Sequence, residues 1–274
     1  MDALTAYKGL RLSNNIEDYP CGIIIPVDKP YRWTSADVLR KVKWLLIKHF
    51  GDKKLKVGHA GTLDPLATGV LLLCVGRATK KAEELQREPK QYLAGVAFGA
   101  TTPSYDREKP IDAVYSLDGV SREALEDVLK RFVGEQEQIA PLFSAKSVDG
   151  VRAYEMARKL HKEGKAPDNS ILSASKINIY SLSLEQFDIP IAEPPATGDD
   201  ERAQRIAVAD ISSAKLLNTD ILVDCSKGTY IRALARDLGE ALGSGAFLSS
   251  LRRTRSGGFR VEDALSLEDV SAML

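Results

Sequence analysis

A single aspartate in a loop of small and turn-forming residues is the part of this sequence best suited to chemistry. Residues 56–69 surround Asp64 with glycine, threonine and proline, and the apolar run of residues 70–75 follows directly. Pro65 keeps Asp64 out of helical backbone geometry, and the glycines allow another molecule to approach the backbone closely. The loop therefore predicts either a rigidly held carboxylate in a reactive site or a structural turn in which Asp64 bonds to nearby backbone.

Arg232 is the second residue whose position requires an explanation. Apolar residues recur at helical spacing over 229–242, so Arg232 falls in the first turn of a predicted helix. The helix dipole favours acidic side chains there rather than a cation. On the predicted polar face, beside Arg236, it is either an ordinary surface arginine or part of a functional site, where local preferences are often broken.

Segments that contain these two residues resemble one enzyme family. Residues 58–69 read GHAGTLDPLATG, residues 76–80 read GRATK, and residues 225–232 read CSKGTYIR. In this order they resemble the catalytic loop and the arginine motif of TruB-type tRNA pseudouridine synthases. The resemblance runs from about residue 22 to about residue 258, with a gap near 188–205. These enzymes detach uracil from the ribose C1′, rotate it and rejoin it through C5.

The resemblance implies roles for both residues. Asp64 matches the aspartate on which the family's catalysis depends, either by attack on the sugar or by removal of a 2′ proton; carboxylates form covalent intermediates at sugar carbons in other enzymes. Arg232 matches the cation that keeps this aspartate ionised, since a neighbouring arginine lowers a carboxyl pKa by about 1–3. The implied substrate is the T-loop uridine at position 55 of tRNA, which must leave its stack before it can react.

The resemblance extends to residues around the target base. Tyr92 matches a tyrosine that packs on the flipped base, and Leu251 matches an apolar residue on the other side; without the resemblance, both are ordinary core or strand residues. His59 matches a position near the target nucleotide. The remaining predicted substrate-binding residues, which would organise the site or contact phosphates, are Lys29, Lys90, Lys227, Tyr230 and Arg253.

Two segments depart from the family pattern. Residues 144–150 read SAKSVDG, with the lysine one place earlier than usual, and residues 101–106 read TTPSYD, where Pro103 and Tyr105 interrupt the usual threonine and aspartate pattern. Neither departure touches Asp64 or Arg232, so both bear on RNA contacts rather than on the chemistry.

The distribution of charge is more informative than its sum. The 274 residues contain 38 basic and 38 acidic side chains, a balance unusual for a protein that binds nucleic acid. Residues 28–61 nevertheless hold nine Lys/Arg against three acids, residues 223–260 hold seven against three, and residues 184–202 hold one against six. The basic segments contain the motifs and suit phosphate contacts, although solvated helix faces would give the same pattern.

Composition argues against several other classes. No apolar run approaches the ~20 residues that span a membrane, and the first residues lack a basic region followed by an apolar one, so we expect neither a membrane span nor a secretory signal. The three cysteines are widely spaced, which suits reduced thiols in a cytoplasm, and the three histidines make no metal-ligand spacing with them. We expect a cytoplasmic enzyme without metal, organic cofactor or obligate protein partner.

Strand and helix signals interleave without a regular βαβ period, which predicts an α+β fold. The resemblance implies a mixed, mainly antiparallel central sheet with flanking helices and active-site loops. We expect one catalytic domain over 1–274, with a mobile acidic loop at 188–204, a short helical tail at 265–274 and no appended RNA-binding domain. The predicted elements are strands at 21–27, 70–75, 91–98, 172–184, 206–214 and 220–225, and helices after Thr34, at 77–87, after Ser121, at 154–163 and at 229–242.

Two other functions fit parts of the pattern. A non-catalytic RNA-binding or tRNA-folding factor would use the same basic surface and Tyr92, but the presence of both Asp64 and Arg232 argues for catalysis. Phosphoryl transfer through Asp64 is rejected, because such sites hold Mg²⁺ with additional acids and Leu66 stands where a second acid is needed. The predicted partner is therefore the T-arm of tRNA, recognised by its phosphates and its shape.

Overall fold

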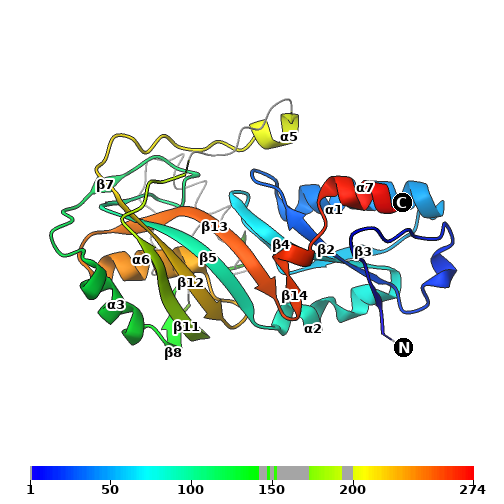
Figure 1. Cartoon of the computed structure of the whole chain (residues 1–274), viewed down its shortest axis with the longest axis horizontal. Coiled ribbons are helices and arrows are strands. Elements are labelled where there is room, and N and C mark those ends of the chain that lie inside the picture. The colour runs from blue at the N-terminus through cyan, green and yellow to red at the C-terminus, as the bar shows by residue number, and fades with distance from the viewer. Residues whose placement is uncertain (1, 142–146, 149–150, 153–172, 193–199) are drawn as a thin grey trace. The chain divides into compact units, whose positions relative to one another are not determined.

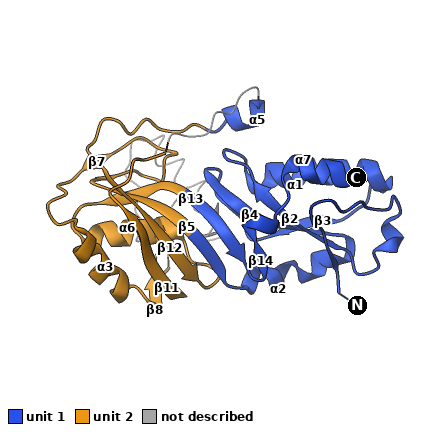
Figure 2. Cartoon of the chain, in the orientation of Figure 1, with its two compact units in different colours: residues 1–92, 195–206, 251–274 blue, residues 93–194, 207–250 orange. Residues whose placement is uncertain are grey.

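The computed structural model describes residues 2–141, 147–148, 151–152, 173–192 and 200–274. The chain divides into two compact units (Figure 2). Unit 1 contains Met1–Tyr92, Pro195–Ile206 and Leu251–Leu274, and unit 2 contains Leu93–Pro194 and Ala207–Ser250. Strands β5 (Lys90–Phe98) and β13 (Ala246–Ser256) each begin in one unit and end in the other.

Unit 1 is built on a sheet that carries the Asp64 loop (Figure 1). Its strands are β1 (Leu4–Thr5), β2 (Ile23–Lys29), β3 (Val57–Ala60), β4 (Ala67–Val75), the end of β13 and β14 (Phe259–Arg260). Strands β2 and β3 run antiparallel to β4, and β13 runs parallel to it. The loop of residues 61–66 connects β3 to β4, so both of its ends are held by the sheet.

Helices cover both faces of this sheet. On one face, Val42 of α1 (Ser35–Phe50) and Met273 of α7 (Leu267–Met273) join a buried cluster with Ile25 and Leu73. On the other face, the short helices η2 (Gly76–Lys81) and α2 (Ala82–Arg87) pack near Cys74. Because both faces are covered, β2 and β4 are buried along nearly their whole length instead of alternating.

Unit 2 contains an antiparallel array in the order β12 (Leu217–Cys225), β11 (Ser175–Phe187) and β8 (Gly134–Gln138). Two helices, α3 (Arg122–Arg131) and α6 (Ile231–Ala241), bury Leu125, Leu234 and Leu238. The remaining short elements among the described residues are η1 (Ile16–Asp18), β6 (Ala100–Thr101), β7 (Ala113–Val114), β9 (Ser147–Val148), β10 (Val151–Arg152), α5 (Glu201–Gln204) and η4 (Val261–Asp263).

The predicted fold class is confirmed. A mixed sheet with parallel and antiparallel pairs is flanked by helices, as expected for an α+β fold. Helix α1 begins after Thr34, as predicted, in a capping box: Thr34 Oγ1 accepts from Asp37 N and the Asp37 carboxylate accepts from Thr34 N. Ser266 caps α7 with the same arrangement. Within the described parts of the chain, no helix is long and apolar enough to cross a membrane.

Several predicted elements need correction. Residues 206–214 contain no strand; Ala209 N instead donates to Arg107 O at 2.7 Å, outside any strand pairing. Strand β4 begins at Ala67, and Val57–Ala60 form β3, because these residues pair with β4 although their sequence suggested only loop. Residues 201–204 form the helix α5 within the predicted acidic loop.

The predicted helix at 154–163 lies outside the described residues. The single catalytic domain and the mobility of the acidic loop stay predictions.

Candidate active site

The backbone next to Asp64 is held by a side chain of α1. Ser35 Oγ donates to Leu63 O at 3.1 Å and accepts from Leu63 N at 2.9 Å. Ser35 is the first residue of the capped helix and is 3% exposed. Its two hydrogen bonds therefore fix the backbone of Leu63, the residue that precedes Asp64. Asp64 itself is half-buried, and its carbonyl accepts from Ala67 N at 3.1 Å where β4 begins. The carboxylate therefore sits on a rigid frame, as a catalytic group requires.

Lys29 holds the residue that follows Asp64. Its Nζ donates to Pro65 O at 3.2 Å, to Pro30 O at 3.0 Å and to Trp33 O, and its side chain is fully buried. Burial lowers the pKa of Lys29 to about 7, while the negative charge of Asp64 acts in the opposite direction. Because all three bonds go to backbone carbonyls, the contacts favour the loop-organising role of Lys29 over phosphate contact.

Arg253 joins the two ends of the Asp64 loop. Its Nε donates to Val70 O at 2.7 Å and its Nη2 donates to Gly61 O at 3.1 Å, and the side chain is 1% exposed. Arg253 lies opposite Gly69 in the β13–β4 register. Gly69 has φ +100°, and a Cβ there would lie 2.2 Å from Arg253 O, so only glycine allows β13 to approach this closely.

The loop that precedes α1 has an anchor of its own. Trp33 Nε1 donates to Asp200 Oδ2 at 2.6 Å, and the Arg202 guanidinium lies 5.3 Å from the Trp33 ring centroid. Arg32 Nη2 also donates to Gln204 O at 3.3 Å. Since Trp33 O accepts from Lys29, the acidic segment that contains α5 supports the frame of the Asp64 loop.

His59 and Leu251 lie on strands that flank the same loop. His59, on β3, has a buried Nδ1 with no hydrogen-bond partner among the described residues. Burial, and then the positive charge of Arg253, lowers the pKa of His59, which favours the neutral form of its imidazole. Leu251 is opposite Ala67 in the parallel register and is half-buried.

Tyr92 and Lys90 lie at the start of β5. Tyr92 is 9% exposed. Lys90 is 5% exposed, and its Nζ donates to Leu85 O at 3.2 Å, to Gln86 O at 3.3 Å and to Glu88 O. Lys90 therefore binds carbonyls at the end of α2, where a cation is favoured, which again suits the organising role rather than phosphate contact.

Arg232 lies in unit 2 and is buried, not on an exposed polar face as the sequence suggested. It is 5% exposed, its Nη1 donates to Ser104 O at 3.2 Å, and the same atom lies 3.7 Å from Asp106 Oδ2. Asp106 accepts from Ser104 Oγ at 2.6 Å and from Glu108 N at 2.9 Å through Oδ1. The helix-dipole penalty at Arg232 is thus offset by a buried carboxylate and a carbonyl from another segment.

The segment that leads into α6 is held by Gln138. Gln138 is 3% exposed, accepts from Tyr230 N at 2.8 Å through Oε1 and donates to Tyr230 O at 3.2 Å. Thr229 Oγ1 donates to Ser226 O at 3.0 Å and does not cap the helix, which begins at Ile231. Lys227 is exposed beside this turn. Of these residues, Lys227 is exposed, which leaves its predicted phosphate contact a prediction, while the backbone of Tyr230 is held by Gln138 at the start of α6.

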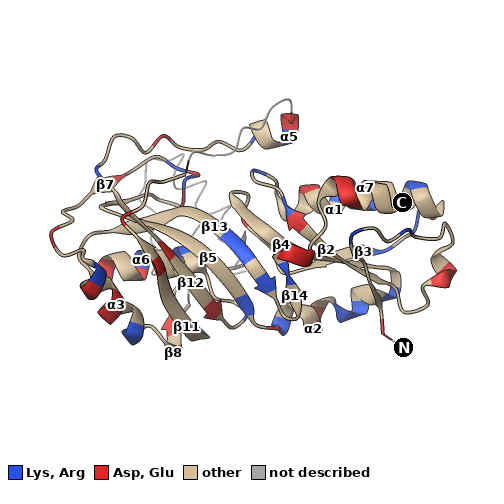
Figure 3. Cartoon of the chain, viewed as in Figure 1, with Lys and Arg blue, Asp and Glu red and all other residues tan. Residues whose placement is uncertain are grey.

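Basic side chains gather on the second half of β13, shown as blue bands in Figure 3. Arg252 donates to both carboxylate oxygens of Asp28, at 3.1 and 2.8 Å, and to Thr68 Oγ1 at 3.3 Å. Arg252 therefore ties β13 to the strands on which the Asp64 loop rests. No cluster of histidine, cysteine, aspartate or glutamate within the described ranges has the arrangement of a metal site.

Comparison with known families identifies the family to which this chain belongs. A family model described as TruB family pseudouridylate synthase (N terminal domain) matches residues 48–231, and a tRNA pseudouridylate synthase B C-terminal domain matches residues 232–274. The chain belongs to the TruB family of pseudouridylate synthases. It is an enzyme, a pseudouridine synthase, and the family resemblance inferred from sequence is confirmed.

Relatives within the TruB family are similar over most of their length. The chain is 46% identical to the tRNA pseudouridine synthase B of Phocaeicola vulgatus, covering 90% of this chain and 91% of that one. It is 44% identical to the protein of the same name from Parabacteroides distasonis, covering 94% and 95%. A solved Cbf5-Nop10-Gar1 complex contains a chain that is 25% identical with a TM-score of 0.60; the match covers 98% of this chain and 60% of that one.

Three residues of this TruB-family frame were missed by the sequence reasoning. Ser35 was noticed only as part of a helix start, Gln138 not at all, and Asp106 only as the end of a segment that departs from the family pattern. Each acts on a residue that is distant in sequence, namely Leu63, Tyr230 and Arg232. A polar residue inside an otherwise apolar or turn-forming segment was the available signal for Ser35 and Asp106, and Gln138 carried none.

Proposed function

We propose that this pseudouridine synthase converts uridine to pseudouridine in the T-loop of tRNA, at position 55. Relatives that are 46% and 44% identical to it carry the name tRNA pseudouridine synthase B, which supports tRNA as the substrate. The observation that carries the proposal is the frame around Asp64, in which Ser35 and Lys29 fix the residues on either side of a single carboxylate. Such a frame suits a group that must be presented to a substrate with a defined orientation.

In the proposed reaction, the C1′–N1 glycosidic bond of the target uridine breaks, the uracil rotates, and a C1′–C5 bond forms; C5 loses its proton and N1 takes up a proton. Asp64 is the essential carboxylate, acting at the sugar or on a 2′ proton. We assign Arg232 to support of its charge, and Tyr92 and Leu251 to contact with the flipped uracil. His59, Lys227, Tyr230, Arg253, Lys29 and Lys90 would bind the RNA or hold the residues that do.

Binding would depend on phosphates of the T-arm and on its shape. The exposed Lys227 supports this partner. None of the three cysteines, Cys21, Cys74 and Cys225, forms a disulfide, which supports work in a reducing compartment such as the cytoplasm.

The test measures tritium release from T-arm RNA labelled as [5-³H]uridine, because formation of the C1′–C5 bond expels the C5 hydrogen. We expect release by the wild type and none by Asp64→Asn, which keeps the size of the side chain and removes its charge. Asp127→Asn, at an exposed carboxylate of α3, is the matched control and should keep wild-type release. Release by Asp64→Asn at the wild-type rate would contradict the proposal, and so would a failure of the wild type to release tritium.

A further inference from the structure

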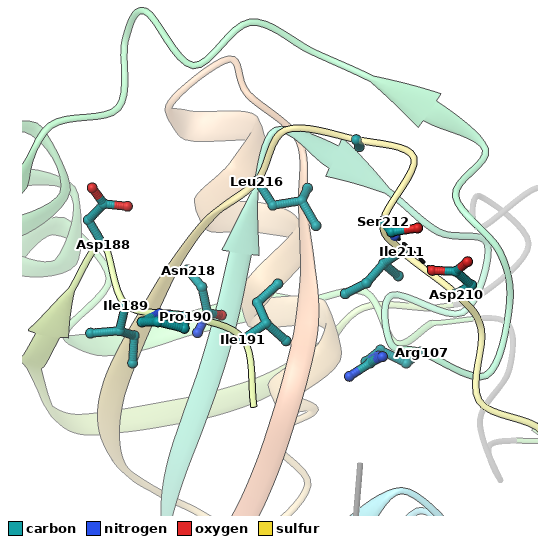
Figure 4. A pocket seen from close by; sticks show the side chains of 11 residues that line it. Arg107, Asp188, Ile189, Pro190, Ile191, Asp210, Ile211, Ser212, Leu216 and Asn218 are labelled. Carbon is teal, nitrogen blue, oxygen red and sulfur yellow. Dashed lines mark hydrogen bonds between the residues drawn. The ribbon is translucent and has the colours of Figure 1, made fainter. Parts of the chain in front are cut away.

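Unit 2 contains a pocket of about 490 Å³ that the proposed chemistry does not use (Figure 4). Its lining comes from Arg107, from the segment that follows β11 and from the segment that precedes and begins β12. The residues used below are Arg107, Asp188, Ile191, Asp210, Ile211 and Leu216. In Figure 4, Asp188 lies on one side of the pocket, Asp210 and Ile211 on the other, and Arg107 near them. This volume is within the range of sites for small organic groups.

Arg107 is a buried cation with unused donors. It is 8% exposed, and its Nη1 donates to Ala192 O across a long 3.5 Å. Its Nε is buried and has no hydrogen-bond partner within the described part of the chain. A guanidinium presents five donors in a plane, and a buried donor that stays unpaired carries a desolvation cost. The side chain is therefore prepared for a planar or forked oxyanion.

The other walls restrict which oxyanion can enter. Ile191, Ile211 and Leu216 offer apolar surface for a flat body. Asp210 already interacts with the positive charge of Arg107, so Asp188 and Asp210 disfavour a group with two negative charges more strongly than a group with one. Both carboxylates can accept hydrogen bonds from hydroxyl or amino groups. The ligand that best suits the pocket carries a single negative charge, a flat apolar group and hydrogen-bond donors. A nucleotide within an RNA chain has these properties, because its phosphodiester carries one charge and its ribose and base carry donors.

Arg107 of the pocket is also adjacent in sequence to the carboxylate that faces Arg232. Arg107 directly follows Asp106, whose carboxylate faces Arg232 at 3.7 Å. We propose that this pocket binds one nucleotide of the RNA substrate other than the target uridine, with its phosphodiester on Arg107 and its base against the isoleucines. The proposal rests on the proposed function and extends it by naming a second point of RNA recognition. A base with an exocyclic amino group is favoured, since one of the two carboxylates, Asp188 or Asp210, can accept from it.

The first test is steady-state turnover of T-arm RNA by Arg107→Met and Arg107→Lys. We expect Arg107→Met to raise KM about tenfold with a smaller change in kcat, and to reduce the slope of log KM against log salt by about 0.7, the contribution of one phosphate on a single strand. Arg107→Lys keeps the positive charge but loses the forked pair of donors. We therefore expect its salt slope to stay close to that of the wild type, while its KM stays raised. Arg131→Met, at an exposed arginine of α3, is the control and should match the wild type.

The second test measures direct binding by calorimetry, so that it does not depend on turnover. We expect the dinucleoside monophosphate CpC to bind more tightly than UpU, cytidine or inorganic phosphate, and Arg107→Met to lose the preference for CpC over cytidine. The proposal would be overturned if Arg107→Met kept the KM and the salt slope of the wild type. It would also be overturned if CpC bound no more tightly than hexanoate, a singly charged apolar anion without a base. If the wild type releases no tritium but binds CpC through Arg107, the proposed function fails while the nucleotide site stands.

Discussion

Arg232 and Asp106 face each other in the interior of unit 2, with Nη1 and Oδ2 3.7 Å apart and both side chains less than a tenth exposed. The pair is completed by Ser104, which accepts from Arg232 through its carbonyl and donates to Asp106 through its hydroxyl. The segment that departs from the family's threonine and aspartate pattern thus supplies the buried partner of the motif arginine. Although Pro103 and Tyr105 interrupt the family pattern, the segment keeps Asp106, whose carboxylate pairs with Arg232.

We expect Asp106→Asn to lower both stability and turnover. Loss of one partner from a buried ion pair leaves an uncompensated charge and costs about 3–5 kcal/mol, with Asn at the low end because it can still accept a hydrogen bond. Urea unfolding measures the stability, and tritium release at a temperature where the variant is folded measures the turnover. Asp127→Asn, which breaks an exposed pair with Lys130, should leave the unfolding midpoint unchanged. Equal midpoints for both variants would contradict the role of Asp106.

Gly69→Ala should be far more damaging than Gly9→Ala. Both glycines have a positive φ, +100° and +89°, so alanine is strained at either position. At Gly69 a Cβ would lie 2.2 Å from Arg253 O, whereas nothing lies within 4 Å of a Cβ at Gly9. The difference in unfolding free energy between the two variants measures the contribution of the close approach of β13 to β4 at Gly69. Similar losses in the two variants would show that backbone strain alone accounts for both.

Lys29 should make the stability of the protein depend on alkaline pH. Its pKa is lowered by burial to about 7 in the folded chain, from 10.5 when unfolded, so between these values the unfolded chain binds more protons. Stability contributed by this group therefore rises as pH increases from about 7 to about 10, and below pH 7 the cost of burying the charge is fully present. From pH 7 to pH 9.5 the gain is at most about 3 kcal/mol.

The measurement is urea unfolding of the wild type and of Lys29→Met at several pH values in this range. Lys29→Met loses three hydrogen bonds and is less stable at every pH, but the extra rise with pH should be absent from it. A wild-type curve parallel to that of Lys29→Met would mean that Lys29 keeps its proton throughout, held by the three carbonyls.

The contact between Trp33 and Asp200 should be visible in tryptophan emission. The chain has two tryptophans, and Trp44 is 57% exposed while Trp33 is 6% exposed, so Trp44→Phe leaves a buried reporter. In that background we expect Asp200→Ala to shift the emission of Trp33 to longer wavelength and to slow tritium release, because Trp33 O helps to hold Lys29. Glu201→Ala, at the exposed neighbour, should change neither. An unchanged spectrum in Asp200→Ala would show that α5 does not shield Trp33.

Features set by neighbours in sequence were predictable. The capping box at Thr34 and Asp37, the buried face of α6 around Leu234 and Leu238, and the apolar strand before Gly76 all depend on residues within one or two turns, so their signals are local. The Asp64 loop was likewise identified from its glycines and proline. Arg232 stood out because it violates the helix dipole, although its burial was not anticipated.

What the sequence by itself determined, then, is the family, the α+β class, the helix starts and the residues that carry the motifs. Only the tertiary structure decided which groups hold them. Ser35 reaches Leu63 across 28 positions, Arg232 reaches Ser104 across 128, and Arg253 reaches Gly61 across 192. Such partners are chosen by strand order and register, because a buried donor must find an acceptor wherever the packed chain places one. No local pattern contains that choice.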